Sequence, residues 1–180
     1  MKYASEDLKN EHEGILFGLQ VLEKMAYLIN DYQPVDDKDL REMVHFLQLF
    51  ADKCHHGKEE GLYFPSLEKA GIQNNGGPVG QLLLEHTEGR NHIAHMADAM
   101  TPALQADAFV KAAIRYIQLM RGHIDKENQT LFISGDQVLP ANEQMRLLEA
   151  FEVFEEQVMG AGTHQKLHNM LDRFEKKYLS

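Results

Sequence analysis

Apolar side chains recur three and four residues apart along most of this 180-residue chain, with little sign of apolar–polar alternation. This spacing gathers them on one face of a helix, whereas a half-buried strand needs alternation. Only five prolines interrupt the pattern, and four of them lie near expected helix boundaries. The sequence therefore predicts an all-α chain.

The spacing predicts four long helices and two shorter ones. They cover residues 4–31, 37–71, 78–101, 105–133, 142–158 and 163–179. Pro65 falls inside the second span, so we expect a kink or an early end there. Short connections favour antiparallel neighbours, which predicts an up-down-up-down four-helix bundle. We assign residues 1–133 to this bundle and residues 134–180 to a C-terminal helical extension packed on it.

The charge balance excludes several partners. Eighteen basic and 28 acidic residues give a formal net charge of −10. Phosphate binding needs clustered Lys and Arg, so we expect no nucleic-acid or anionic membrane partner. No apolar run approaches the roughly 18 residues of a membrane span, and no signal peptide is visible. The single cysteine, Cys54, excludes an internal disulfide and fits a reducing compartment, so we expect a cytoplasmic protein.

Each long helix carries one histidine where its apolar stripe calls for a buried residue. These are His12, His55, His86 and His123. Two of the four are followed four residues later by a glutamate, Glu59 and Glu127 respectively. Side chains four apart lie on the same helix face, with Cβ atoms about 5–6 Å apart. The pattern H, HxxxE, H, HxxxE therefore predicts imidazoles and carboxylates meeting inside the bundle.

These six residues also share one height in the predicted bundle. At 1.5 Å per residue, antiparallel helices place all of them roughly 9–21 Å from the same end. An apolar core does not accept two carboxylates without compensation, because burying an unpaired charge costs several kcal/mol. The stripes contain no Lys or Arg that could pair with them. We therefore favour a metal cluster over a set of hydrogen-bonded core histidines.

The donor set narrows the choice of metal. Imidazole with carboxylate suits Fe, Mn or Zn. Two octahedral ions offer about twelve positions, of which four histidines, two bridging glutamates and a bridging oxo or hydroxo group would fill about ten. The remaining positions could bind a small ligand such as O2, peroxide or NO, whereas a structural site is closed.

Four segments resemble the hemerythrin-like, or HHE cation-binding, proteins. They are LKNEHEGI (8–15), CHHGKEEGLYFP (54–65), LLLEHTEGR (82–90) and GHIDKENQTLF (122–132). The resemblance covers about residues 4–133 and implies a four-helix bundle around a non-haem di-iron centre. It implies His12, His55, Glu59, His86, His123 and Glu127 as iron ligands, with Glu59 and Glu127 bridging. The implied cofactor is two oxo- or hydroxo-bridged Fe ions, for which Zn or Mn could substitute.

Three positions depart from the family pattern. Arg90 stands where oxygen-carrying hemerythrins have a fifth histidine. Those proteins also use an aspartate five residues after the last histidine, whereas here the carboxylate is Glu127, four residues after His123. One histidine fewer leaves another open position or a solvent ligand, which disfavours bulk oxygen transport. The segment LFIS (131–134) replaces the usual LFP, which leaves the end of this helix open.

The expected function is that of a non-haem di-iron protein whose cluster binds or reacts with O2, peroxide or NO. Redox chemistry, a stress response or sensing fits better than transport, and peroxidase- or catalase-like turnover is one form of it. An iron- or oxygen-sensing module without turnover and a zinc-filled structural bundle are the alternatives. The expected partner is a small diatomic or peroxide ligand, and a homodimer is the assembly considered.

A second HxxxE pair, His56 and Glu60, lies one residue along from His55 and Glu59. In an α-helix it falls about 100° from the apolar seam, on a polar face. We therefore favour His55 and Glu59 as the ligands, with His56 available for a supporting hydrogen bond.

Five further residues are open to two interpretations. His164 and His168, four apart in the last helix, could form an exposed metal clip, but the polar side of a packing helix is favoured. Tyr63 and Tyr116 could donate to a metal ligand or fill the core. Cys54 is either a buried thiol or a redox-sensitive one. No sequence repeat of fixed period is visible.

Overall fold

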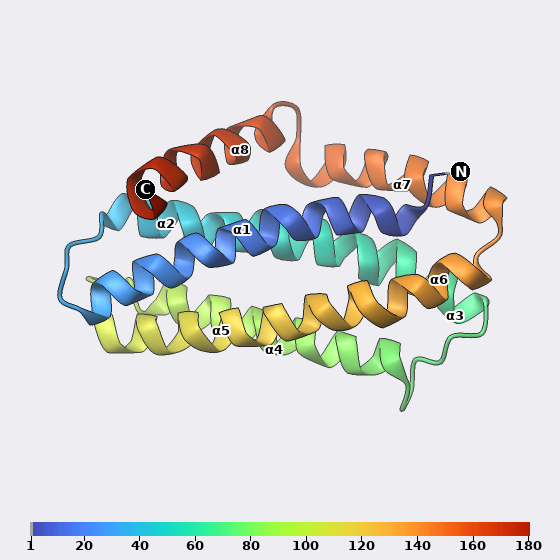
Figure 1. Cartoon of the computed structure of the whole chain (residues 1–180), viewed down its shortest axis with the longest axis horizontal. Helices are drawn as coiled ribbons and strands as arrows, with labels where there is room; N and C mark the ends of the chain where they lie inside the picture. Colours follow the sequence, from blue (N-terminus) through green and yellow to red (C-terminus); the bar gives the residue numbers. More distant parts are fainter. Residues whose placement is uncertain (1) are drawn as a thin grey trace.

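A computed structural model describes residues 2–180, which contain helices and loops but no strand. Four helical rods run up, down, up and down, and two further helices lie along one side of them (Figure 1). The predicted all-α bundle with additional C-terminal helices is confirmed.

The first two rods match their expected spans closely. The first is α1, Ala4–Asn30. The second is continuous from residue 37 to residue 69 and comprises α2 (Asp37–Phe46), η1 (Leu47–His56), η2 (Glu59–Tyr63) and α3 (Phe64–Lys69). The η segments are π-helical. An early end at Pro65 is wrong: Pro65 lies in the first turn of α3, directly after the π-helical turn of η2, where a missing backbone N–H is tolerated.

The second pair of rods differs from expectation only at its ends. The third is α4, Pro78–Asp98. The fourth is continuous through α5 (Ala106–Lys126), η3 (Glu127–Leu131) and α6 (Phe132–Val138). It runs five residues past the predicted end at residue 133, because no proline interrupts it before Pro140.

Two hydrophobic clusters fill the bundle, and each draws on all four rods. The larger includes Leu19 and Leu22 of α1 with Met96, Phe109 and Met120. The smaller lies at the end that holds α3 and α6, and includes Leu8, Phe64, Leu82 and Phe132. Along α1, His12 falls between Leu8 of the smaller cluster and Ile15 of the larger. The predicted histidine layer is therefore enclosed by apolar packing on both sides.

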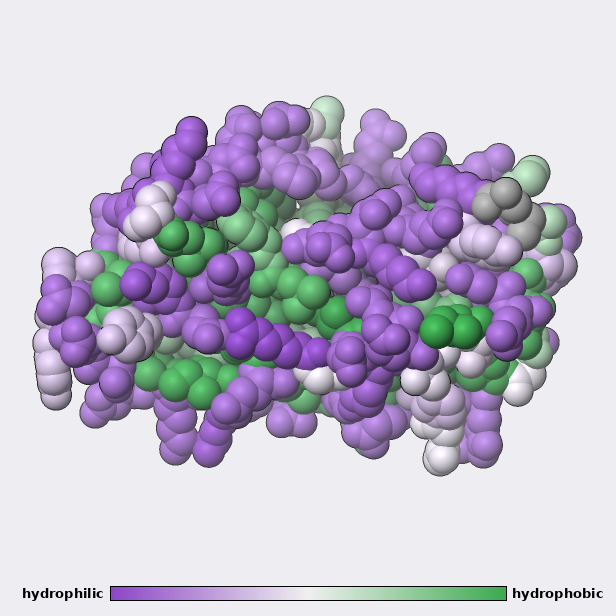
Figure 2. Space-filling view, viewed as in Figure 1, coloured by the Kyte–Doolittle hydropathy of each residue, from purple (hydrophilic) through white to green (hydrophobic). Residues whose placement is uncertain are grey.

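The C-terminal helices α7 (Ala141–Met159) and α8 (Thr163–Phe174) follow the bundle, and the chain ends with η4 (Glu175–Leu179). The helix α7 buries Leu147 and Phe151 in the smaller cluster, and Phe174 of α8 packs into the larger one. The face shown in Figure 2 is mainly hydrophilic, with scattered hydrophobic patches. Among the described helices, none combines the length and the apolar character that a membrane span requires.

Candidate metal centre

The two rods that carry HxxxE pairs change their winding at the site. The π-helical segment η1 ends at His56, and the π-helical segments η2 and η3 begin at Glu59 and Glu127. Such segments are rare and often mark functional sites, because they redirect side chains that an α-helix would point elsewhere. Both glutamates thus enter the bundle at equivalent points of their rods.

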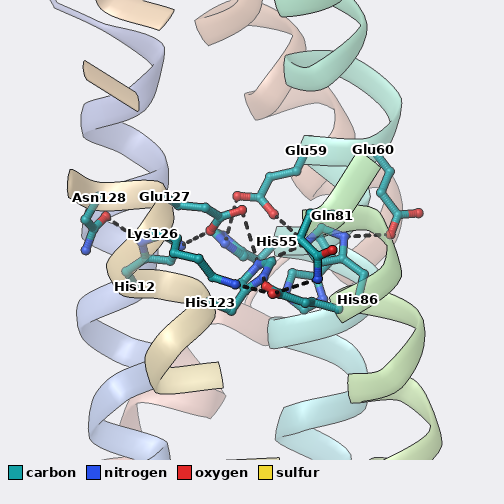
Figure 3. A network of polar contacts seen from close by, with 12 residues as sticks. His12, His55, Glu59, Glu60, Gln81, His86, His123, Lys126, Glu127 and Asn128 are labelled. Atoms are coloured by element: carbon teal, nitrogen blue, oxygen red, sulfur yellow. Dashed lines mark hydrogen bonds and ion pairs between the residues drawn. The ribbon is translucent and has the colours of Figure 1, made fainter. Parts of the chain in front are cut away.

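Glu59 lies between two histidines from different rods. Its Oε1 is 3.3 Å from Nε2 of His55, and its Oε2 is 3.2 Å from Nε2 of His86. All three side chains are fully buried or nearly so. Each oxygen of this carboxylate therefore faces a different imidazole, as a bridging ligand would (Figure 3).

Glu127 is placed in the same way. Its Oε2 is 3.1 Å from Nε2 of His12, and its Oε1 is 3.2 Å from Nε2 of His123. The layer closes where Nε2 of His86 approaches Nε2 of His123 at 3.1 Å. The structure thus brings together all six residues that the sequence analysis selected.

His56 joins this cluster, so its predicted place on a polar face is wrong. It is only 2% exposed, and its ring stacks on His86 with centroids 3.8 Å apart. The reason is the wider turn of η1, which reduces the angle between successive side chains and lets both His55 and His56 face inward. The α-helical geometry assumed for this stretch gave no signal of it.

The ligating atoms fall into two groups that share Glu59. The first, here called the His12 site, holds His12, His55, Glu59 and Glu127. The second, the His86 site, holds His56, Glu59, His86 and His123. Within each group one donor atom per residue lies within 4.8 Å of all the others. The arrangement therefore offers two adjacent metal positions.

Outer carboxylates hold two of the histidines in orientation. Nδ1 of His55 lies 2.7 Å from Glu11, and Nδ1 of His123 lies 2.8 Å from Glu85. Metal-binding histidines commonly donate their second N–H in this way, which fixes the tautomer and leaves the other nitrogen free. Glu11 and Glu85 each directly precede a predicted ligand in the sequence but serve the histidine of the next rod, which is why sequence reasoning missed them.

The other two predicted histidine ligands are held by residues that follow the bridging glutamates. Nδ1 of His86 lies 2.8 Å from Glu60, and Nδ1 of His12 lies 2.8 Å from the side-chain oxygen of Asn128. Arg90 binds Glu60 at 2.6 Å. The residue that stands in place of the oxygen carriers' fifth histidine thus supports His86 through Glu60.

These contacts reveal an approximate two-fold repeat that no fixed sequence period shows. Each helix pair reads Glu-His in its first rod and HxxKE in its second. Corresponding residues are Glu11 and Glu85, His12 and His86, His55 and His123, Lys58 and Lys126, Glu59 and Glu127, and Phe64 and Phe132. The repeat is not periodic in sequence because the two pairs have connections of different lengths.

The electrostatics of the layer favour protonated histidines in the absence of a cation. Burial alone would lower the pKa of His55, but Glu59 and other carboxylates raise it to about 10. Burial likewise acts against His123, yet Glu127 raises its pKa to about 9. Burial lowers the pKa of His56 well below its ordinary value, and the neighbouring imidazoles add to this.

The unpartnered atoms fit a cation. Eight buried side-chain atoms of the layer lack a hydrogen bond of proper geometry, and they include all four oxygens of Glu59 and Glu127. The others are nitrogens of His12, His55 and His56. Buried polar atoms are normally satisfied. Imidazole nitrogens and carboxylate oxygens converging in one layer are the donors that Fe, Mn and Zn accept.

A third acidic group nearby already contains a cation. Glu11, Cys54 and Glu155 approach one another, but the ammonium of Lys58 lies 2.5 Å from Glu11 and 3.0 Å from Glu155. Lys58 is completely buried. Burial and the nearby Glu11 raise the pKa of the Cys54 thiol to about 12, which favours an inert thiol over a redox-sensitive one.

Aromatic rings close the layer on the side of the smaller cluster. Phe132 stacks on His12 and Phe64 stacks on His86, at centroid distances of 5.5 and 5.8 Å. The Tyr63 ring packs against Phe132, and its buried hydroxyl has no hydrogen-bond partner. Tyr116 is likewise buried with an unpartnered hydroxyl, but in the larger cluster.

The fold and the buried His/Glu layer define a helical-bundle protein whose core can bind metal cations. The model of the hemerythrin HHE cation-binding domain matches residues 3–132. The chain therefore belongs to the hemerythrin HHE cation-binding family. Comparisons with curated proteins and with solved structures found no match.

Proposed function

We propose that the layer holds two iron ions and that the protein binds or reacts with O2, peroxide or NO. The observation that supports this most is the set of eight unpartnered atoms, whose two carboxylates each face histidines of both rod pairs. Ligands of this proposal are His12, His55, Glu59, His86, His123 and Glu127, with His56 added. Bound iron would supply redox chemistry toward a small ligand.

The two positions are unequal. The His12 site has two histidines, whereas the His86 site has three because of His56. Two octahedral ions offer about twelve places, and five histidines, two bridging carboxylates and one bridging solvent oxygen fill about eleven. The place that remains belongs to the site with fewer histidines. A small ligand would therefore enter beside His12.

The surroundings of His12 suit a small apolar molecule. Phe132 covers the ring of His12, and Leu8 lies one turn away on α1. This shell excludes bulk water and large substrates, which favours a diatomic gas or peroxide. The Tyr63 hydroxyl is unpartnered in the same cluster and lies against Gly135. Burial raises the pKa of Tyr63, so it remains a protonated donor.

A series of polar contacts favours the sensing alternative. Glu155 of α7 binds Lys58, which binds Glu11, which in turn holds His55. A change at the His12 site can thus reach the C-terminal helices through three polar contacts. A module that reports iron or oxygen through these helices would use this connection.

The decisive experiment measures metal on protein purified without metal supplementation, followed by optical spectra before and after anaerobic addition of NO, O2 or peroxide. We expect about two irons per chain and spectral changes with at least one of the three. Stoichiometric zinc with less than one iron per chain would favour the structural alternative. Continuous peroxide consumption would separate turnover from sensing.

A further inference from the structure

A second pair of histidines converges outside the bundle, on α8. Nε2 of His168 lies 2.8 Å from Nε2 of His164, with ring centroids 4.6 Å apart. The residues are four apart on one helix, so they share a face. His86 and His123 of the buried layer approach each other in a similar way, with 3.1 Å between their Nε2 atoms. The two pairs therefore have the same ligand-like geometry.

The two histidine pairs are also similar at the other ring nitrogen, Nδ1. Nδ1 of His164 lies 3.0 Å from Oε1 of Glu155, as Nδ1 of His123 lies close to Glu85. A carboxylate at Nδ1 holds the proton there and turns the lone pair of Nε2 outward, which is the arrangement of histidines that bind metal. In this tautomer, the lone pair of His164 Nε2 faces His168, whose Nε2–H donates to it when no ion is bound.

The local fold creates this contact. The turn between α7 and α8 uses Gly160 and Gly162 with φ of 76° and 79°, a region that glycine adopts readily. The reversal brings the start of α8 back to the end of α7. A cavity of about 350 Å³ at this turn is lined by Glu152, Glu155 and Glu156 together with His164. The carboxylates offset the positive end of the α8 dipole and attract a cation.

We propose that His164 and His168 form a metal site separate from the buried layer, which takes a late first-row divalent cation such as Zn²⁺, Ni²⁺ or Cu²⁺. Imidazole suits these ions, and water fills the remaining places. Both side chains are exposed, so the site exchanges its ion with solvent, unlike the buried layer. Glu155 positions His164 and also binds Lys58, which in turn binds Glu11 beside the buried layer.

The test uses the full chain, passed over a chelating resin to remove loose ions, and titrates it with Ni²⁺ and Zn²⁺ by calorimetry. We expect one exchangeable equivalent in addition to the tightly held metal. His164→Ala and His168→Ala should each weaken this binding at least tenfold, and Glu155→Gln should weaken it several-fold. None of the histidine variants should change the tightly held metal.

His95→Ala is the matched control, because His95 is an exposed histidine on α4 with no carboxylate contact. It should leave the exchangeable ion in place. With Cu²⁺ as the probe, the electron paramagnetic resonance spectrum should show two nitrogen ligands in the parent and one in His168→Ala. The proposal fails if the parent binds no exchangeable ion, or if His95→Ala weakens binding as much as His168→Ala.

Discussion

The two helix pairs of the bundle are built alike and differ at three positions that matter for the metal layer. His56 of the first pair corresponds to Ile124 of the second. Lys58 is buried beneath α7, whereas the side chain of Lys126 is half exposed. Glu60, which carries a charge, corresponds to the neutral Asn128. The shared residues create two adjacent positions, and the differing ones make those positions unequal.

These differences show how two helix pairs of the same design can give two unequal metal positions. Under the proposed two-ion arrangement, the additional histidine would complete one site and leave the other with a free place. Because Glu155 of α7 binds Lys58, only the first helix pair is linked to the C-terminal helices through this lysine. Most of the variants that test this difference have the corresponding residue of the other pair as their reference.

The bridging carboxylates should give the largest effect. Glu59 belongs to both sites, and Glu127 of the His12 site also lies 3.2 Å from Nε2 of His123 in the His86 site. Glu59→Ala and Glu127→Ala should therefore each lose most of both ions. Metal per chain, measured by mass spectrometry, tests this. Glu13→Ala, a change at an exposed glutamate on α1, should keep its metal. Unchanged metal content in Glu127→Ala would exclude this residue as a ligand.

Loss of a single histidine should distinguish the two sites. His12→Ala leaves the His12 site with one histidine, and we expect metal content to fall from about two ions to about one. His86→Ala leaves two histidines in the His86 site, so its second ion should bind more weakly but remain detectable at high metal concentration. Equal losses in the two variants would contradict the unequal arrangement.

His56→Ile makes the first pair resemble the second. We expect a weaker ion at the His86 site, by more than the roughly 10–100-fold that accompanies the loss of an outer-shell partner. His55→Ala should reduce metal content more, because the His12 site has no third histidine. Titration with Fe²⁺ under anaerobic conditions measures both effects, and the reverse order would make His56, rather than His55, the more important ligand.

The outer carboxylates should separate metal affinity from stability. Glu11→Gln and Glu85→Gln should each lower affinity roughly 10–100-fold. Glu11→Gln also removes one of the charge partners of the fully buried Lys58, which keeps Glu155, so it should cost about 1–3 kcal/mol of unfolding free energy. Glu85→Gln should cost far less, since Lys126 can turn to water. Urea unfolding of the two variants measures the contrast.

The pH dependence of the metal-free protein tests the buried layer without any substitution. The pKa values of His55 and His123 are raised from 6.5 to about 10 and about 9. Their stabilising contribution is therefore complete below about pH 6.5 and is lost as the pH rises through 9 to 10. The pKa of Glu59 is lowered from 4.5 to about 2, so its contribution is present above about pH 4.5 and is lost toward pH 2.

We expect maximal stability of the metal-free chain between these limits, near pH 4.5–6.5, from urea unfolding across the range. Metal binding removes the protons from the two histidines, so loading should flatten the alkaline side of the curve. An unchanged alkaline limb after loading would mean that neither histidine is a ligand.

The fold could be predicted from the sequence because the helical spacing of apolar residues and the positions of the turn residues indicate the same helix boundaries over nearly the whole chain. The six layer residues followed from the same period, since azimuth and height both depend only on helix geometry. His56 could not be predicted, because π-helical winding comes from packing between rods. Glu11 and Glu85 were also beyond reach, because each serves a histidine on another rod and the pairing depends on how the rods are set side by side.

The apolar packing on both sides of the histidine layer has a consequence for how the protein matures. Domains such as zinc fingers cannot fold until the metal arrives. Here both hydrophobic clusters draw on all four rods and need no metal to form, so we expect the chain to reach its folded form empty. Acquisition of metal then becomes a separate event after folding, and local opening of the rods sets its pace. We therefore expect folded, metal-free protein wherever metal is scarce, and its share should fall as metal becomes available.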